Sequence, residues 1–377
     1  MNNIQRFIES QLADRREKGL LRQLNASKLP YDFCSNDYLG FARSTAIAQK
    51  VVELLSEFQP YLNGSGGSRL LSGNHPFTES TEAYIAGFHG FESALLFNSG
   101  YDANVGLLSS LPQKGDTVIT DELIHASLID GIRLSHANRL RFAHNNTEAL
   151  AERLQRAVGK CYVVVESIYS MDGDAAPLQE IASVCRQYNA GLIVDEAHAI
   201  GIKGRAGRGV VAELGLQQQV LACVYTYGKA LGTHGAAICG NSSLRDYLLN
   251  FARSFIYSTA AAPHTIASIH AAYLHLEHGN YSELLKNRTA LFDNLLQDFI
   301  SPPPPADAAI RSVICPGNFE AKTTAARLQS AGFDVRAILS PTVASGTERL
   351  RICLHTFNTD EEINALVKHL REGLKKN

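Results

Sequence analysis

The stretch Leu192-Ile193-Val194-Asp195-Glu196-Ala197-His198 joins a short apolar run to two acids and a histidine. A second apolar run, residues 221–225, leads in the same way into Thr226-Tyr227-Gly228-Lys229. Neither run alternates polar with apolar residues, which is typical of parallel strands covered on both faces. Ligands of such sheets bind beyond the carboxyl ends of the strands, so Asp195 and Lys229 could face one crevice.

Similar apolar runs recur along the chain between stretches with helical periodicity. The runs comprise residues 94–97, 117–120, 162–165 and 236–239, and the helical stretches comprise residues 45–58, 77–88, 147–157 and 177–188. Alternation of strands and helices over this length predicts an α/β fold with a large, doubly wound, mostly parallel sheet.

The two ends of the chain depart from this alternation. We expect a helix over residues 2–24 and a short strand at 31–35. The run Pro302-Pro303-Pro304-Pro305 indicates a loop, and beyond it short strands at 312–314 and 349–354 accompany helices at 321–331 and 360–374. We therefore predict an N-terminal helix and arm (1–45), a large α/β domain (46–275) and a small α+β C-terminal domain (276–377).

The composition is that of an ordinary globular protein. Of 377 residues 45% are hydrophobic and 19% charged, and the net charge is -2. These values give no reason to expect nucleic acid or a membrane surface as a partner. The seven cysteines are scattered and never spaced C-x-x-C, so we expect free thiols, no metal site and a cytoplasmic location. No secretory signal and no stretch of about 20 apolar residues is present, which predicts a soluble protein.

A carboxylate and a lysine at neighbouring strand ends are the pair that pyridoxal phosphate (PLP) chemistry requires. The lysine forms an imine with the cofactor aldehyde, and the carboxylate keeps the pyridine nitrogen protonated. Asp195 precedes Lys229 by 34 residues, which leaves room for a crossover helix, or for a loop at 201–209 with a short helix. Alone, such a lysine is commonly a surface residue and such an aspartate a helix cap. Asp-Glu-Ala-His could also suggest a helicase box, but the phosphate loop that this function requires is absent from the sequence.

Three further strand ends carry polar residues. Asn98-Ser99-Gly100-Tyr101 opens a predicted helix, and backbone N–H groups at a helix start suit a phosphate; an ordinary turn is the alternative. His125 follows the run at 117–120 and could stack on a flat cofactor, although a lone histidine is more often structural. Residues 166–174 form a polar loop whose Ser, Asp and Gly content is also typical of plain turns.

Two more motifs gain meaning only in combination. Gly64-Ser65-Gly66-Gly67-Ser68-Arg69 is either a flexible turn or a loop that approaches a ligand closely. Arg349-Leu350-Arg351 could clamp a substrate carboxylate bidentately, yet Arg-x-Arg alone carries no information.

Together these motifs resemble those of the α-oxoamine synthases, PLP enzymes of fold type I. The likeness extends from residues 31–40 to residues 349–351, is weakest at 294–309, and is closest to the members of biotin biosynthesis. It implies catalytic roles for Lys229, which carries the cofactor, for Asp195, which pairs with the pyridine nitrogen, and for His125, which stacks on the ring. The further cofactor contacts that it implies are His198, Ser170, Thr226, Gly100 and Tyr101. Contacts lent by the other subunit of a homodimer are Ser258 and Thr259, and substrate contacts are Arg22, Thr342, Arg351 and His125.

The resemblance also implies the reaction. L-Alanine condenses with an acyl thioester, pimeloyl-CoA or pimeloyl-carrier protein, with loss of CO2, to give 8-amino-7-oxononanoate. Sibling activities stay open: glycine C-acetyltransferase, or a synthase of aminoketone or hydroxyketone signals. An aminotransferase or lyase of the same fold would act without a thioester, and a non-enzymatic binding protein would lack the cofactor.

Two departures from the family pattern concern the substrate side. Ala199-Ile200-Gly201 follows His198 where many members have Gly-Thr-Gly, and Ser72-Gly73-Asn74-His75 differs from the pattern of well-known bacterial members. Both lie near the family's substrate entrance, so they put the acyl group in question more than the cofactor.

Overall fold

A central seven-stranded sheet organises the larger part of the molecule. The computed structural model describes residues 2–24, 26, 28–60, 63–297 and 308–374. The strand order is β2-β8-β7-β6-β5-β3-β4, with bounds β2 Ser93–Phe97, β3 Thr117–Asp121, β4 Asn138–Phe142, β5 Cys161–Glu166, β6 Gly191–Asp195, β7 Val220–Thr226 and β8 Ala236–Gly240. Strand β8 runs antiparallel to both of its neighbours, while the other pairs are parallel. The predicted doubly wound, mostly parallel sheet is confirmed.

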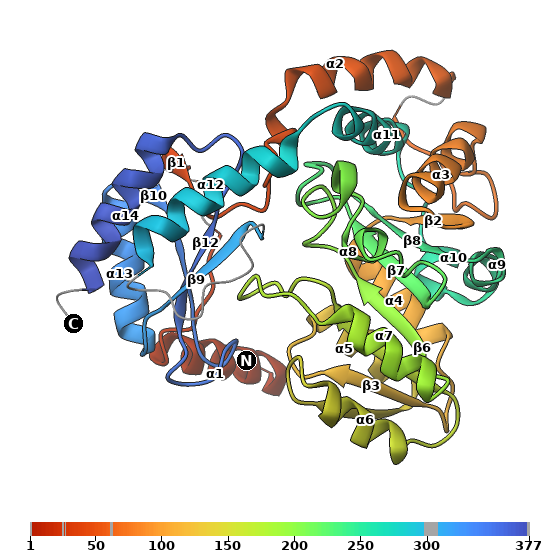
Figure 1. Cartoon of the computed structure of the whole chain (residues 1–377), viewed down its shortest axis with the longest axis horizontal. Helices are drawn as coiled ribbons and strands as arrows, with labels where there is room; N and C mark the ends of the chain where they lie inside the picture. Colours follow the sequence, from red (N-terminus) through yellow and green to blue (C-terminus); the bar gives the residue numbers. More distant parts are fainter. Residues whose placement is uncertain (1, 25, 27, 61–62, 298–307, 375–377) are drawn as a thin grey trace.

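Helices cover both faces of this sheet (Figure 1), and successive side chains of a strand enter different apolar clusters. In β6, Ile193 packs with residues of helices α4, α5 and α9, whereas Leu192 and Val194 pack on the opposite side. The first group has the bounds α4 Gly100–Ser110, α5 Ala126–Ser135 and α9 Ser242–Phe251. The second side is covered by α3 Pro76–His89, α6 Thr147–Gln155, α7 Leu178–Gln187 and α11 Pro263–Glu277. Burial on both faces explains why the strands lack polar alternation.

The C-terminal part forms a smaller α+β unit beside the large sheet (Figure 1). Its antiparallel sheet has the order β11-β12-β9, with bounds β9 Ile310–Ile314, β11 Arg336–Ile338 and β12 Arg349–Cys353. Helix α13 Asn318–Ser330 packs against this sheet, and α14 Asp360–Leu374 packs against α13 and against α12 Tyr281–Leu296, which precedes the sheet. The expected elements of this unit are therefore present. The domain boundaries at 45/46 and 275/276 stay a prediction, and Pro302–Pro305 lies outside the described residues.

Chain segments from the two ends meet in this smaller unit. Strand β1, Tyr31–Asp32, pairs in parallel with β10, Phe333–Asp334. Residues 33–44 then lead over the junction between the two units into α2, Thr45–Leu54, and a short 3-10 helix, Leu55–Phe58. This arm brings the segment 35–38 to the carboxyl edge of the large sheet.

One expected helix is shorter than predicted, and one strand was not predicted at all. The helix predicted for residues 2–24 is α1, Asn3–Glu17, and it ends early because Gly19 takes a positive φ of 63° that terminates the helix. Strand β4 was missed, because Asn-Arg-Leu-Arg-Phe is an edge strand whose two arginines, one of them exposed, interrupt the apolar pattern. The short elements α8 Val210–Glu213 and α10 Arg253–Ile256 complete the described helices.

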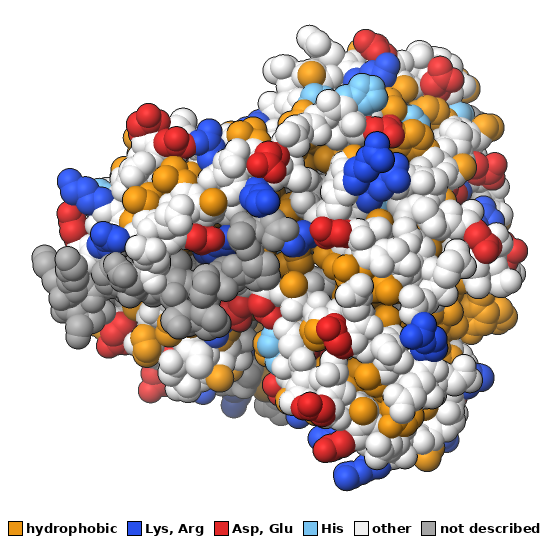
Figure 2. All heavy atoms as spheres, viewed as in Figure 1, with side chains coloured by type: hydrophobic (Ala, Val, Ile, Leu, Met, Phe, Trp, Pro, Cys, Tyr) orange, Lys and Arg blue, Asp and Glu red, His pale blue; other side chains and the backbone are white. Residues whose placement is uncertain are grey.

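The surface carries charges of both signs. In Figure 2, lysines and arginines lie among aspartates and glutamates over the visible face, as the net charge of -2 suggests. Within the described part of the chain, no helix combines the length and apolar character needed to cross a bilayer.

Candidate active site

A cavity of about 300 Å³ opens at the carboxyl edge of the large sheet. Strand ends and helix starts supply its walls: Glu166 ends β5, Asp195 ends β6, Thr226 ends β7, and His125 precedes α5. The residues predicted for the site that line this cavity are Gly100, Tyr101, His125, Asp195, His198, Thr226 and Lys229. Strands β6 and β7 are parallel neighbours, and the loop with the short helix α8 makes their connection. Of the two connections that the sequence allowed, the structure has the loop with a short helix and not the single crossover helix.

Lys229 is half-buried in this cavity. Its Nζ lies 3.2 Å from Thr226 Oγ1 and donates a hydrogen bond to it. Burial lowers the pKa of Lys229, an effect that the negative charge of Asp195 partly opposes. A larger fraction of the amine is therefore neutral near pH 7 than in an exposed lysine, and a neutral amine can act as a nucleophile or a base.

The Asp195 carboxylate is buried, with 4% of the residue exposed. Its Oδ1 accepts the backbone N–H of Ala197 at 2.9 Å, and its Oδ2 accepts Asn104 Nδ2 at 2.9 Å. Both donors are neutral amides, so they orient the carboxylate without neutralising its charge. The carboxylate can therefore hold a cationic group in the cavity.

Asn104 continues this contact toward His125. Its Nδ2 also donates to Ser127 Oγ at 3.0 Å, and Ser127 Oγ lies 2.8 Å from His125 Nδ1. The chain Asp195–Asn104–Ser127–His125 thus links the carboxylate to the imidazole through neutral side chains. Sequence reasoning missed Asn104 and Ser127, because both lie inside helices that cover the sheet and nothing in their spacing marks them.

The His125 ring caps helix α5, since Nδ1 accepts the backbone N–H of Ser127. The residue is exposed toward the open cavity. Desolvation by the surrounding protein lowers the pKa of His125, with a further contribution from Lys229, while Asp195 opposes the shift. The imidazole is therefore neutral at pH 7 and presents a flat, uncharged face to a ligand.

His198 lies opposite, on the side of the N-terminal arm. Its Nδ1 is 2.9 Å from the hydroxyl of Tyr38, which donates to Asn36 Oδ1 at 3.0 Å. Arg351 Nη2 donates to the same Asn36 oxygen at 3.1 Å. Burial lowers the pKa of His198 well below its ordinary value, and the charges of Lys229 and Arg351 act in the same direction. The arm thus connects the histidine to the arginine of the smaller unit.

Gly100, the first residue of α4, gives the cavity one tight contact. A Cβ at this position would lie 2.5 Å from Thr226 Cγ2, so glycine is required for the helix start to approach β7. Ser99 caps the helix through a hydrogen bond from the backbone N–H of Asp102 to its Oγ, at 3.0 Å. Backbone N–H groups at this helix start, with the Thr226 hydroxyl nearby, suit an anion such as a phosphate. Tyr101 is 47% exposed at the cavity, and its hydroxyl bonds Asp130.

Glu166 is the buried group that the sequence did not single out. It lines the cavity with 2% of the residue exposed, and its Oε1 has no hydrogen-bond partner among the described residues. Burial raises the pKa of Glu166 well above its ordinary value, and the nearby charge of Asp195 adds to this. The carboxyls of Glu166 and Asp195 thus lie side by side on neighbouring strands, and burial favours the neutral form of Glu166.

Other predicted residues lie outside the cavity lining. Ser170 sits on the loop after β5, where its carbonyl accepts Arg351 Nε at 2.8 Å. Arg22 and Thr342 line a separate cavity of about 380 Å³, together with Arg15 and Lys322. Ser258 and Thr259 line a third, small cavity, where Asn98 Nδ2 donates to the Thr259 carbonyl at 2.9 Å. Within the described residues of one chain, these five side chains do not line the cavity of Lys229, and that of Arg351 does not line it either.

Comparison with known proteins agrees with this geometry. The family model for aminotransferase class I and II matches residues 30–370. The chain is 41% identical to an 8-amino-7-oxononanoate synthase of Emericella nidulans over 378 residues, which cover 92% of this chain and 89% of that protein.

Solved structures show the same architecture. A structure of SPT (serine palmitoyltransferase) with PLP superposes with a TM-score of 0.90 at 26% identity, over 100% of this chain and 99% of that one. The 8-amino-7-oxononanoate synthase of Francisella tularensis has a TM-score of 0.80 at 28% identity, over 92% of this chain and 98% of that one.

Proposed function

Because the chain belongs to the aminotransferase class I and II family, we propose that it is a PLP enzyme that condenses L-alanine with a pimeloyl thioester. The products are 8-amino-7-oxononanoate, CO2 and the free thiol of CoA or of a carrier protein. The observation that carries the proposal is the meeting of Lys229 and Asp195 in one cavity, in a chain 41% identical to a protein with this activity.

The cavity residues fit PLP in three respects. The Asp195 carboxylate is held by neutral donors and suits a protonated pyridine nitrogen. Gly100 lies so close to Thr226 that any Cβ would occupy the space between them. Because glycine has no Cβ, the backbone N–H groups at the start of α4 stay accessible to a phosphate. The amine of Lys229, whose pKa is lowered, lies in the same cavity as Asp195 and the start of α4. His125 and His198 line the same cavity; His125 would stack on the ring, and His198 would make a further contact with the cofactor.

When bound, PLP supplies an aldehyde that captures an amine and a protonated ring that withdraws electrons from the adjoining carbon. Asp195 keeps the ring nitrogen protonated, because its charge is buried and not neutralised by its amide partners. Lys229 Nζ can take the Cα proton of L-alanine and return it later, since its lowered pKa leaves part of it unprotonated. Arg351 grips the alanine carboxylate, with Asn36 holding the guanidinium in place. His125, neutral and planar, would stack on the ring of the bound cofactor without adding charge.

The test of the reaction is a panel of donors and acceptors. L-Alanine, glycine, L-serine and 2-aminobutyrate are each combined with pimeloyl-, acetyl- and palmitoyl-CoA and with pimeloyl-carrier protein, and thiol release is followed. We expect the highest kcat/KM for L-alanine with a pimeloyl thioester. Preference for glycine with acetyl-CoA, or for another pair, would replace the proposal by a sibling activity. The panel also decides between CoA and carrier protein.

The control for the panel is Lys229→Ala. This variant should retain PLP through the other contacts and lose the visible absorption of the lysine-bound cofactor. It should release thiol no faster than the enzyme-free mixture. Normal product formation by Lys229→Ala would refute the assigned role of this lysine.

We also propose a homodimer with shared active sites and a cytoplasmic location. The seven cysteines are free, which supports a reducing compartment. Helix α1 exposes Ile4, Phe7, Ile8 and Leu12, and a second protomer would cover such a face. The position of Ser258 and Thr259 away from Lys229 supports a role for them in a partner's site.

A further inference from the structure

The segment Ser35-Asn36-Asp37-Tyr38 carries two residues of the site but has no regular secondary structure. Asn36 lines the cavity, and the Tyr38 hydroxyl holds His198. Asn36 Oδ1 accepts from Tyr38 and from Arg351, whereas its amide N–H groups have no hydrogen-bond partner among the described residues and can donate to a ligand. The position of this segment therefore decides where Arg351 and Asn36 point. This reasoning rests on the proposed function, because it concerns the residues that would hold the amino-acid substrate.

Backbone hydrogen bonds fasten the two sides of the segment to the smaller unit. The N–H of Cys353 donates to the carbonyl of Phe33 at 2.9 Å, and the N–H of Thr356 donates to the carbonyl of Tyr38 at 2.9 Å. Between these two points the chain must turn away from β12. The middle of the turn, at Ser35 and Asn36, needs a side chain to hold it.

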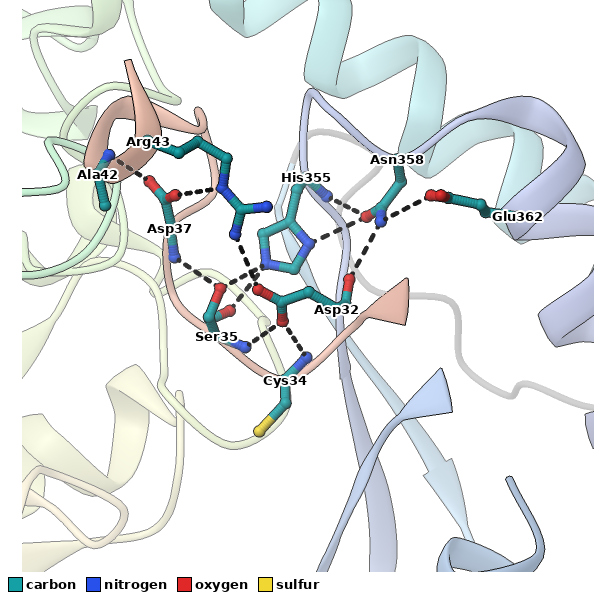
Figure 3. Close-up of polar contacts among 9 residues, drawn as sticks. All are labelled: Asp32, Cys34, Ser35, Asp37, Ala42, Arg43, His355, Asn358 and Glu362. Carbon is teal, nitrogen blue, oxygen red and sulfur yellow. Dashed lines mark hydrogen bonds and ion pairs between the residues drawn. The ribbon is translucent and has the colours of Figure 1, made fainter. Parts of the chain in front are cut away.

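His355 provides this contact, as Figure 3 shows. The residue has 0% exposure and follows Arg351 by four positions. Its Nε2 lies 2.9 Å from the Ser35 carbonyl and 3.2 Å from Ser35 Oγ. Its Nδ1 lies 3.0 Å from Asn358 Oδ1. The ring thus spans from the turn to the loop that leads into α14.

Asn358 fixes the ring from behind. Its Oδ1 also accepts the backbone N–H of His355 at 2.9 Å, and its Nδ2 donates to the Asp32 carbonyl at 3.0 Å. With both ends of the amide engaged, Asn358 cannot rotate without breaking its hydrogen bonds to His355 and to Asp32 (Figure 3). The imidazole is therefore held in one orientation against Ser35.

Charged groups shape the same turn from the other side. Asp32 Oδ1 accepts the backbone N–H groups of Cys34 at 3.1 Å and Ser35 at 2.9 Å, and its Oδ2 pairs with Arg43 at 3.1 Å. Asp37 Oδ2 pairs with Arg43 Nε at 3.2 Å. These contacts bend the segment on itself, whereas His355 ties it to the strand that bears Arg351.

We propose that His355 is a positioning residue for the amino-acid substrate, which holds Ser35 so that Asn36 and Arg351 keep the geometry needed to bind the substrate carboxylate. Asn358 supports His355 in this role. His355 itself touches neither substrate nor cofactor.

The test compares His355→Asn with His355→Gln. The Asn side chain can reach the Nδ1 position and keep the contact with Asn358, but it leaves Ser35 unsupported. The Gln side chain can place its amide near the Nε2 position and contact Ser35. In the holoenzyme we expect His355→Asn to raise the KM for L-alanine about tenfold, with kcat and the thioester KM within about threefold of wild type. His355→Gln should restore most of the alanine affinity.

A second readout is the equilibrium binding of L-alanine without thioester, followed by the change in cofactor absorbance. The dissociation constant should rise in parallel with KM. His89→Gln is the matched control: His89 is equally buried, with Nδ1 2.9 Å from the Arg208 carbonyl and Nε2 2.8 Å from the Tyr273 hydroxyl. It should lower thermal stability and leave alanine binding unchanged.

The outcomes separate this inference from the proposed function. If the wild-type holoenzyme binds no L-alanine, the proposed function fails, and the variants are then compared with the amino acid that the panel identifies. If wild type binds and His355→Asn binds equally well, the positioning role is refuted. Equal losses in His355→Asn and His89→Gln would also refute it, because they would indicate a general effect of destabilisation. Should His355→Asn not fold, Asn358→Ala, which frees the ring, is expected to raise the alanine KM about threefold, and an unchanged KM would overturn the proposal.

Discussion

At position 100 only glycine fits, because any side chain would collide with Thr226 beside the cavity. Gly100 at the start of α4 lies against Thr226, where an added Cβ would stand 2.5 Å from Cγ2. Thr226 in turn accepts the hydrogen bond of Lys229. A side chain at Gly100 would therefore displace the threonine and the lysine together and narrow the space at the helix start.

Gly100→Ala is expected to weaken PLP binding to the apoprotein about tenfold or more, because the displaced Thr226 no longer supports the phosphate end or Lys229. The dissociation constant is measured by absorbance titration with PLP. Gly87→Ala is the matched control, since Gly87 is an exposed helical glycine whose Cβ would meet nothing within 4 Å. It should leave PLP affinity unchanged and stabilise the fold by about 1 kcal/mol. Unaltered PLP binding in Gly100→Ala would contradict this account.

Sequence reasoning reached those site residues that follow strands directly. Lys229, Asp195 and His125 are recognisable because a polar residue after a buried strand faces the ligand edge of a parallel sheet. Asn104 could not be found in this way, because it contacts Asp195 only once α4 is packed against the sheet. Glu166 stands at a strand end too, yet its burial, with Oε1 unpaired among the described residues, is visible only in three dimensions.

Among the elements, the loop after β5 joins the two units of the molecule. Arg351 Nε donates to its Ser170 carbonyl, Ser312 Oγ donates to its Met171 carbonyl at 2.8 Å, and Arg349 pairs with its Asp172. On the other side His144, which follows β4, clamps the loop. Its Nδ1 lies 2.9 Å from Asp121 and its Nε2 lies 2.7 Å from Asp174. The edge strand β4, which the sequence pattern did not reveal, thus places the histidine that holds a loop of the site.

His144→Gln should remove a stabilising contribution that depends on pH. The hydrogen bonds and charges of Asp121 and Asp174 outweigh burial and raise the pKa of His144 to about 10, compared with 6.5 for a free histidine. The folded protein binds this proton more tightly than the unfolded chain does, so the contribution is complete below pH 6.5 and disappears as the pH rises through 10. At pH 6 we expect the variant to be less stable than wild type by about 3 kcal/mol, with the difference shrinking toward pH 10.

Urea unfolding of both proteins at pH 6, 8 and 10 measures this difference. His278→Gln serves as the control, because His278 is exposed at the end of α11 and should show no such trend. A stability difference that stays constant from pH 6 to pH 10 would show that His144 is not held as the charged form.

For the whole molecule, the sequence pattern could predict two units and a mostly parallel sheet, but not the strand order or the antiparallel β8. The apolar runs look alike whether a strand is parallel or antiparallel, and only packing decides its neighbours. The same limit applies to assembly. The sequence shows that α1 has an apolar face, but not whether the rest of the same chain or a second protomer covers it. Within this chain the face stays exposed, at Ile4, Phe7, Ile8 and Leu12.

A shared site makes a quantitative prediction about mixed dimers. Lys229 and Asp195 lie in one cavity of one chain, whereas Ser258 and Thr259 lie in another cavity and would serve the partner's site. Lys229→Ala and the double variant Ser258→Ala/Thr259→Ala should each be impaired alone. When the two are co-refolded, half of the dimers are hybrids with one intact site, so about a quarter of wild-type activity should return. Mixing Lys229→Ala with Asp195→Ala is the control and should restore nothing, because these two residues must come from the same chain. No recovery in the first mixture despite dimer exchange would mean that each site is built from a single protomer. Recovery in the control would mean that Lys229 and Asp195 of one site come from different protomers.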